Sequence, residues 1–128
     1  MYKIKNKDLK SYKFHKWTES QIAKFWIYEN NFPENFWGHN FGLSLIKMFK
    51  KQIKKSNHIL DYGCGDGSII RHILKYTNKN QKVYGFEHDC KSITNLKKKF
   101  FHEKNLYFFS NKNFPNKKFD IIFCTEVI

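Results

Sequence analysis

Two different hydrophobic patterns divide the chain near residue 57. Before this point, apolar residues recur at the three- and four-residue spacing of amphipathic helices. After it, short apolar runs alternate with helix-like stretches, as in the strand and crossover-helix units of a parallel sheet. The pattern predicts an α/β domain over residues 57–128, preceded over residues 1–56 by an N-terminal arm and helices that we expect to form a lid or cap.

The N-terminal part is predicted to hold two helices joined by an aromatic loop. Thr18 and Gln21 have the spacing of a capping box, so the first helix is expected to begin there. The second helix is expected over residues 41–55. Asn, Pro and Gly predict a loop over residues 32–41, whose large aromatic side chains fit equally a lid over a ligand and simple packing on the sheet.

Four strands are predicted in the second part of the chain. They are expected at residues 58–62, 82–87, 106–109 and 119–124. Helices are expected over residues 66–76 and from Asp89 onward, where the Asp89 carboxylate can cap the first turn. Every second element in this part is therefore a helix.

Composition limits the class of protein. A chain of 128 residues with 41% hydrophobic residues can bury the core of one small domain. It has no apolar run long enough to span a membrane and no secretory signal, so we expect a cytoplasmic protein. The three cysteines are far apart, which predicts reduced thiols and no metal site.

The charge is strongly basic, at +13 with an isoelectric point near 9.7. Such a charge raises nucleic acid as a partner. However, the lysines are spread along the whole chain and fall on predicted helix surfaces, and we find no element that would recognise bases. The sequence therefore favours a solvated basic surface over a nucleic-acid partner.

The stretch GCGDG, residues 63–67, is the strongest candidate for a ligand site. It leaves a predicted strand, opens a predicted helix, and is followed by Glu87 at the end of the next strand, where a carboxylate can accept hydrogen bonds from a ribose. A glycine-rich turn that only packs a strand against a helix is the simpler alternative. The context favours a nucleoside ligand.

Charge separates two kinds of nucleoside ligand. Asp61 and Asp66 flank the loop, and they would repel the pyrophosphate of a dinucleotide. Ser68 also stands where the dinucleotide pattern has Gly or Ala. The loop therefore favours a ligand that carries positive charge and no phosphate.

Three motifs, ILDYGCGDG, VYGFEHD and FDIIFCTEV, resemble the first, second and fourth motifs of the class I S-adenosylmethionine-dependent methyltransferases. The resemblance covers most of residues 57–128. It implies a Rossmann-like, doubly wound parallel sheet, S-adenosyl-L-methionine as cofactor, and methyl transfer as the activity. We expect the sheet to be truncated after the fourth strand, with an exposed edge that permits self-association.

The resemblance also implies roles for single residues. Asp61 and the loop backbone would hold the methionine part of the cofactor, Glu87 the ribose hydroxyls, and His88 the adenine. Asn111 stands where the family commonly has an acid that accepts from the adenine amino group, and an amide oxygen can also accept this bond, although Asn111 fits a plain turn equally well. The full predicted set is Asp61, Gly63, Cys64, Gly65, Gly67, Glu87, His88, Asn111 and Thr125.

The expected function is methyl transfer to an unidentified acceptor, a small molecule or a sugar- or lipid-type metabolite. Displacement at a sulfonium needs positioning more than a base, so no catalytic residue is assigned. If the acceptor must lose a proton, His39 and Glu126 are the candidates, and each also fits an ordinary polar residue. The alternatives are a non-catalytic fragment that binds S-adenosylmethionine or a nucleoside, and a basic nucleic-acid-binding module.

Overall fold

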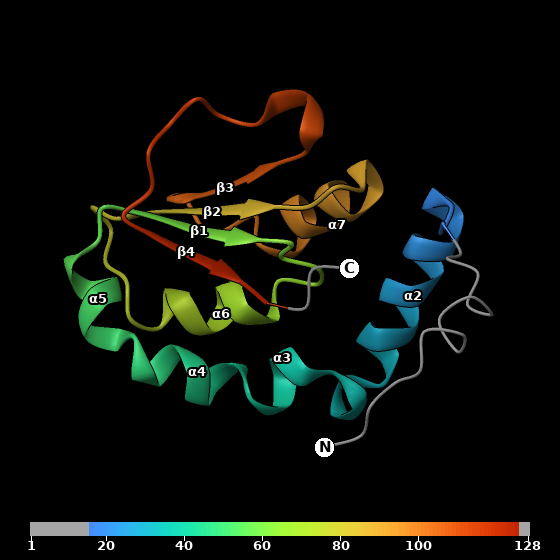
Figure 1. Ribbon diagram of the computed structural model, residues 1–128, viewed down its shortest axis with the longest axis horizontal. Helices are drawn as coiled ribbons and strands as arrows, with labels where there is room; N and C mark the ends of the chain where they lie inside the picture. Colours follow the sequence, from blue (N-terminus) through green and yellow to red (C-terminus); the bar gives the residue numbers. More distant parts are fainter. Residues whose placement is uncertain (1–15, 126–128) are drawn as a thin grey trace, which may run out of the picture.

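Four parallel strands form the sheet of the computed structural model, which describes residues 16–125 (Figure 1). The strands are β1 (His58–Tyr62), β2 (Lys82–Phe86), β3 (Leu106–Phe109) and β4 (Ile121–Cys124). They are ordered β3-β2-β1-β4, so β1 is central and pairs with both β2 and β4. The chain continues on opposite sides of β1, and open α/β sheets bind ligands at the carboxyl ends of the strands beside such a switch point. The predicted Rossmann-like α/β class is confirmed.

The helices divide into a layer on the sheet and a helix beside it. Their bounds are α2 (Glu19–Asn31), α3 (Trp37–Asn40), α4 (Gly42–Met48), α5 (Lys50–Lys55), α6 (Ser68–Leu74) and α7 (Cys90–Lys99). Figure 1 shows α4, α5 and α6 along one face of the sheet, while the carboxyl ends of the strands point toward α2. The carboxyl edge of the sheet therefore faces α2 (Figure 1).

One apolar core joins the helical layer to the sheet. Its members come from α4 to α7, from every strand and from the loop after β1: Ile46, Ile53, Ile59, Cys64, Ile69, Ile70, Ile73, Val83, Ile93, Leu96, Phe108 and Phe123. Burial of each isoleucine contributes about 1.5–3 kcal/mol relative to leaving it exposed. On the other face, Leu60, Tyr84 and Phe86 pack with Phe109 and Phe119.

Both predicted helix caps are confirmed. The Thr18 hydroxyl accepts from the Gln21 N–H at 3.3 Å, and the Gln21 side chain accepts from the Thr18 N–H at 2.8 Å, which completes the capping box. Asp89 accepts from the N–H groups of Lys91 and Ser92 at the start of α7. Local sequence signals therefore determine where α2 and α7 begin.

The predicted helix over residues 41–55 is wrong as a single element. It is broken at Phe49 into α4 and α5, where the Phe49 N–H bonds to Ile46 in a tightened last turn. The break lets the Phe49 ring meet Phe123 of β4 edge to face, with ring centroids 5.9 Å apart. A tertiary contact thus overrides a continuous helical pattern.

The predicted loop over residues 32–41 also differs, because it contains the short 3₁₀ turn η1 (Pro33–Asn35) and α3. Pro33 occupies the first turn of η1, where its missing N–H costs nothing. Trp37 on α3 packs against the main core. Aromatic anchoring therefore gives regular structure to residues whose composition is typical of a loop.

Several element ends are shorter than predicted, since β2 ends at Phe86 and not at residue 87, and α6 ends at Leu74 and not at residue 76. Strand β4 begins at Ile121 because the Asp120 carboxylate turns back to accept from the N–H groups of Asn57 and His58, at 2.7 and 2.8 Å. Helix α6 begins at Ser68 and not at residue 66, because Gly67 has a left-handed conformation.

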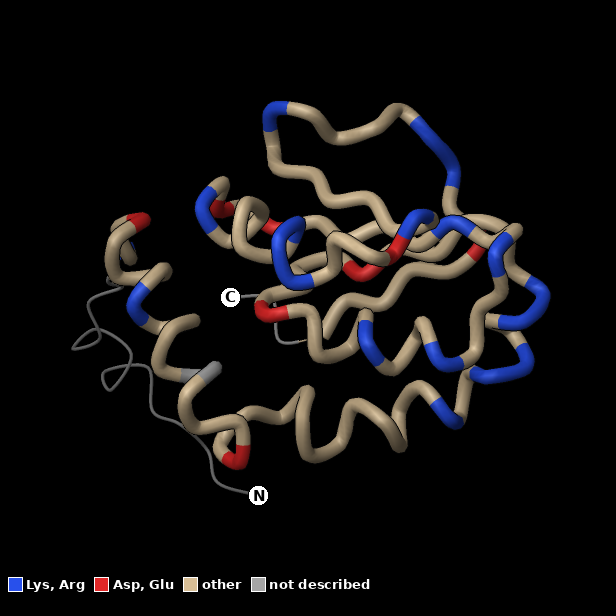
Figure 2. The backbone as a smooth tube through the Cα atoms, turned by 180° about the vertical axis from the view of Figure 1, so that it is seen from behind, with Lys and Arg blue, Asp and Glu red and all other residues tan. Residues whose placement is uncertain are grey.

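Charge is distributed unevenly over the fold. Figure 2 shows many Lys and Arg residues at the turns on the far side of the sheet from α2. They include the lysines of α5 and Lys82 at the start of β2. Within residues 16–125, no helix is long and apolar enough to cross a membrane.

Candidate functional site

The loop over residues 63–67 connects β1 to α6. Its glycines Gly63, Gly65 and Gly67 have φ angles of 74°, 49° and 81°, in the left-handed region that other residues enter at a cost. The N–H groups of Gly63 and Cys64 both donate to the Phe86 carbonyl at 2.9 Å, so the loop is tied to the end of β2. Cys64 is buried, and burial together with Asp61 raises the pKa of its thiol.

Asp61, on β1 just before the loop, is a buried carboxylate with 1% exposure. Neither of its oxygens has a hydrogen-bond partner among the described residues. Burial, and then the charges of Glu87 and Asp66, raise the pKa of Asp61 to about 8. A buried acceptor without a donor is costly, so the chemistry here fits a cationic or N–H-bearing ligand group.

Glu87, directly after β2, holds the loop. One carboxylate oxygen accepts from the Gly65 N–H at 2.9 Å, and the other accepts from the His88 N–H at 2.8 Å. Each oxygen of an ionised carboxylate has a further lone pair, so Glu87 can also accept from a ligand hydroxyl. Its place beside the loop agrees with the predicted position, and its ribose contact stays a prediction.

The remaining predicted residues lie along the same edge of the sheet. The Asn111 side-chain nitrogen contacts Nδ1 of His88, which joins the ends of β3 and β2. Thr125 follows Cys124 at the end of β4, and Cys124 is the pairing partner of Tyr62 on β1. The predicted set therefore lies along one rim of the sheet.

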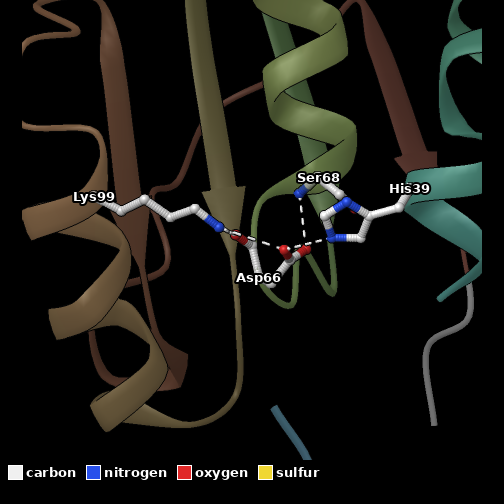
Figure 3. A network of polar contacts seen from close by, with 4 residues as sticks. All are labelled: His39, Asp66, Ser68 and Lys99. Atoms are coloured by element: carbon white, nitrogen blue, oxygen red, sulfur yellow. Dashed lines mark hydrogen bonds and ion pairs between the residues drawn. The ribbon is translucent and has the colours of Figure 1, made fainter. Parts of the chain in front are cut away.

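Asp66 is the second buried acid of the loop, and it has three partners (Figure 3). Its Oδ2 lies 3.0 Å from His39 Nε2 and 3.4 Å from Lys99 Nζ, and its Oδ1 accepts from the Ser68 N–H at 2.9 Å. Burial alone would raise the pKa of Asp66, but Lys99, the Ser68 N–H and His39 together lower it. Sequence reasoning found Asp66 but neither side-chain partner.

Trp26 of α2 is a further site residue that sequence reasoning missed, because it was assigned only to the apolar stripe of its helix. Its indole covers Gly65 so closely that a Cβ added there would lie 2.5 Å from the ring. Trp26 also meets the Phe36 ring edge to face, and Phe36 meets His39, at centroid distances of 5.7 Å in both pairs. The only sequence signal was the high density of aromatic residues between 25 and 41.

The two candidate bases have different outcomes. His39 lies next to the loop, with Nε2 committed to Asp66. Glu126 lies outside the described residues. The part of the chain that the structure describes contains no cluster of three His, Cys, Asp or Glu residues that could hold a metal, and the three cysteines are free.

Comparisons with known proteins place this geometry in a family. The model of a methyltransferase domain family matches residues 37–128. No curated protein matches the chain.

Solved structures share the fold at low sequence identity. A candidate RNA methyltransferase from Pyrococcus horikoshii is 20% identical with a TM-score of 0.56, and the match covers 67% of this chain and 44% of that one. An amino pentose methyltransferase from Micromonospora echinaspora, bound to S-adenosylmethionine, is 15% identical with a TM-score of 0.55, covering 88% and 44%. A Podospora anserina methyltransferase bound to S-adenosylhomocysteine is 18% identical with a TM-score of 0.54, covering 80% and 48%.

This chain therefore spans less than half the length of those three structures. The family model, in contrast, covers most of this chain and includes the whole glycine loop. Together with the sheet order and the loop geometry, this match shows that the chain belongs to the class I S-adenosylmethionine-dependent methyltransferases.

Proposed function

We propose that this chain binds S-adenosylmethionine at the glycine loop and takes part in methyl transfer to a small-molecule acceptor. The observation that carries the proposal is Asp61, whose buried carboxylate has no partner among the described residues and lies beside a loop of left-handed glycines. Its oxygens match an ammonium group of the cofactor. A phosphate would be repelled there by Asp61, Asp66 and Glu87.

The residues of the rim would divide the cofactor among them. Asp61 would accept from the amino group of the methionine part, and the close approach permitted at Gly63 would let the chain backbone contact it. Glu87 has acceptor capacity for the ribose hydroxyls, while His88 and Asn111 lie where the adenine is expected. When bound, the cofactor supplies a methyl group on a sulfonium, and the protein's part is orientation and exclusion of water.

The N-terminal helices would supply the lid. Trp26 on Gly65 and His39 on Asp66 already place α2 and α3 over the loop. Aromatic side chains can also contact a cationic ligand group favourably. Within the lid or cap expected over residues 1–56, we therefore propose that Trp26 acts together with the aromatic loop of residues 32–41.

The proposed acceptor is a small metabolite. A metabolite, such as a sugar-type molecule, is supported by the amino pentose methyltransferase that shares the fold. A base is not required for every acceptor, so His39 and Glu126 stay predictions.

The cytoplasmic location is supported by three free thiols. Self-association through the edge of β4 is supported by Ile122, which is 56% exposed, and light scattering would test it.

Isothermal titration of the full chain with S-adenosylmethionine, S-adenosylhomocysteine and NAD⁺ tests the function. We expect both adenosyl ligands to bind and NAD⁺ to bind at least about tenfold more weakly, because the buried acids oppose phosphate. Tighter binding of NAD⁺ would overturn the cofactor assignment. Binding without methyl transfer to any metabolite or RNA acceptor would support the non-catalytic alternative.

A further inference from the structure

Asp66 joins three elements that are distant in the sequence, as Figure 3 shows. His39 comes from α3, Lys99 is the last residue of α7, and the Ser68 N–H begins α6. We propose that His39 and Lys99 are positioning residues. Through their contacts with Asp66, which we call the clasp, they hold the N-terminal helices over the glycine loop of residues 63–67. The clasp thereby sets how tightly the methyl donor, S-adenosylmethionine, is bound. This proposal rests on the proposed function for the donor, but the clasp itself can be tested without one.

The geometry of the clasp makes Asp66 a fixed point of the loop. Lys99 Nζ donates to the Asp66 backbone carbonyl at 2.7 Å and lies 3.4 Å from Oδ2, so the lysine binds both the main chain and the side chain. The Asp66 side chain is 1% exposed, whereas those of His39 and Lys99 are 25% and 33% exposed. The Asp66 carboxylate, which both residues contact, is therefore shielded from water. His39 and Lys99 are partly exposed and can still move away from it.

The clasp is continuous with the lid. His39 contacts the Phe36 ring, Phe36 contacts Trp26, and Trp26 covers Gly65. The lid therefore meets the loop twice, through a polar contact at Asp66 and an aromatic contact at Gly65. When the His39 contact is lost, α3 loses its only side-chain hydrogen bond to the loop within residues 16–125, and the support behind Trp26 weakens.

If His39 and Lys99 had a merely structural role, their loss would lower global stability and would not speed local opening of the lid more than that of the core. A positioning role instead predicts faster local opening of residues 19–40, measured without any ligand, together with weaker donor binding. Lys99 adds a second criterion, because it reaches Asp66 from α7 and not from the lid. Its loss should therefore affect the loop and the donor more than it affects exchange in α2.

The test compares His39→Phe and Lys99→Met with the matched controls His102→Phe and Lys98→Met. His39→Phe keeps a ring against Phe36 and removes only the polar contact. Lys99→Met keeps the apolar stem, and Lys99→Arg should restore the charge. The controls change exposed residues of the same types. Each variant of the 128-residue chain is titrated with S-adenosylhomocysteine, and its amide exchange is measured without ligand.

We expect His39→Phe and Lys99→Met each to weaken binding of S-adenosylhomocysteine about threefold to tenfold, the scale of one lost hydrogen bond to a charged group. Exchange of residues 19–40 should be at least about threefold faster in His39→Phe than in wild type, and the controls should match wild type within about twofold. Because both partners share Oδ2, the double variant should lose less than the two single losses combined.

Unchanged exchange in His39→Phe, or exchange that rises equally in α2 and in the core strands, would overturn the clasp. Equal effects of Lys99→Met and Lys98→Met would remove Lys99 from it. If the wild-type chain binds no adenosyl ligand, the proposed function fails, and the exchange of residues 19–40 still decides whether the clasp exists.

Discussion

The two ends of the glycine loop carry buried acids with opposite surroundings. Asp61, at the strand end, has no partner among the described residues, and its pKa is raised to about 8, first by burial. Asp66, at the helix end, contacts His39, Lys99 and Ser68, which lower its pKa although burial opposes them. Burial alone therefore does not define a ligand site. The protein itself supplies the polar partners of Asp66. Asp61 instead matches a cationic group of a ligand.

The glycines beside these acids show the same contrast. A Cβ on Gly67 would lie 2.7 Å from Phe100 and 3.0 Å from Leu96, which belong to the packing around α7. The three atoms nearest to a Cβ on Gly65 would all belong to Trp26 of the lid. The helix end is thus packed into the domain, whereas the strand end is covered by an element on the outside.

The largest effect is expected from Gly67→Ala. A left-handed conformation costs an alanine about 1–2 kcal/mol, and crowding against Phe100 adds about 1–3 kcal/mol. The free energy of unfolding, measured with urea, should therefore fall by about 2–5 kcal/mol.

Gly65→Ala is the matched control, because its conformation carries the same backbone cost while Trp26 can move away. It should destabilise the fold by only about 1–2 kcal/mol, and it should speed amide exchange in α2. Equal losses of stability in the two variants would mean that both ends of the loop are packed alike.

Asp61→Asn should produce the next largest effect, on binding. Loss of a charged acceptor should weaken S-adenosylhomocysteine by about 2–3 kcal/mol in isothermal titration at neutral pH. The unliganded variant should be about as stable as wild type at pH 7, because the raised pKa already keeps most of this carboxyl uncharged there and the amide has a similar shape. A variant that lost stability but kept its affinity would show that Asp61 is structural.

The contrast between Asp61 and Asp66 marks how far the sequence could predict this protein. The existence of the four strands, both helix caps and the position of the loop follow from local periodicity and from motif spacing, which is why they were predicted. Both acids were recognised beside the loop, and the family resemblance assigned only Asp61 to the cofactor, but the sequence did not show that Asp66 has partners within the chain. Their partners decide the difference, and these partners come from α3 and α7 through tertiary packing.

Trp26 and Phe49 show the same limit. Each lies in a helical pattern that predicts an ordinary apolar position, yet Trp26 covers Gly65 and Phe49 breaks its helix to reach Phe123. Periodicity assigns a residue to a helix face. It does not say which distant element that face will meet.

Asp66→Asn should have a smaller effect, on stability. The amide keeps an acceptor for the Ser68 N–H but loses the charge that attracts His39 and Lys99. Because both partners are partly exposed, we expect a loss of about 1–2 kcal/mol in the free energy of unfolding at pH 7. The exposed Glu103→Gln is the control and should change it by less than about 0.5 kcal/mol.

The same variant should change the acid response. A lowered pKa in the folded state contributes stability above the ordinary aspartate pKa, and this stability is lost as the pH falls through the folded value. Wild type should therefore lose more stability than Asp66→Asn below about pH 4. Parallel acid titrations of the two proteins would contradict the ionised clasp.

The smallest expected signal is a proton that leaves Asp61 on binding. With a pKa raised to about 8, this carboxyl is mostly protonated at pH 7 before a ligand arrives. A neighbouring ammonium group favours the charged form and lowers that pKa. Titration of S-adenosylhomocysteine in buffers of different ionisation enthalpy should therefore show release of about 0.5–1 proton near pH 7, and less near pH 9, where the carboxyl is already ionised.

The raised pKa of Asp61 should also make the stability of the unliganded chain depend on pH. Because the folded-state pKa of Asp61 lies above the ordinary value of 3.8, the folded chain binds the extra proton, and its stability should fall as the pH rises from about 4 through about 8. Asp61→Asn should remove this decline and the proton release together, while Asp66→Asn should keep both. Proton release that persists in Asp61→Asn would assign it to another group and would end the distinction between the two acids of the loop.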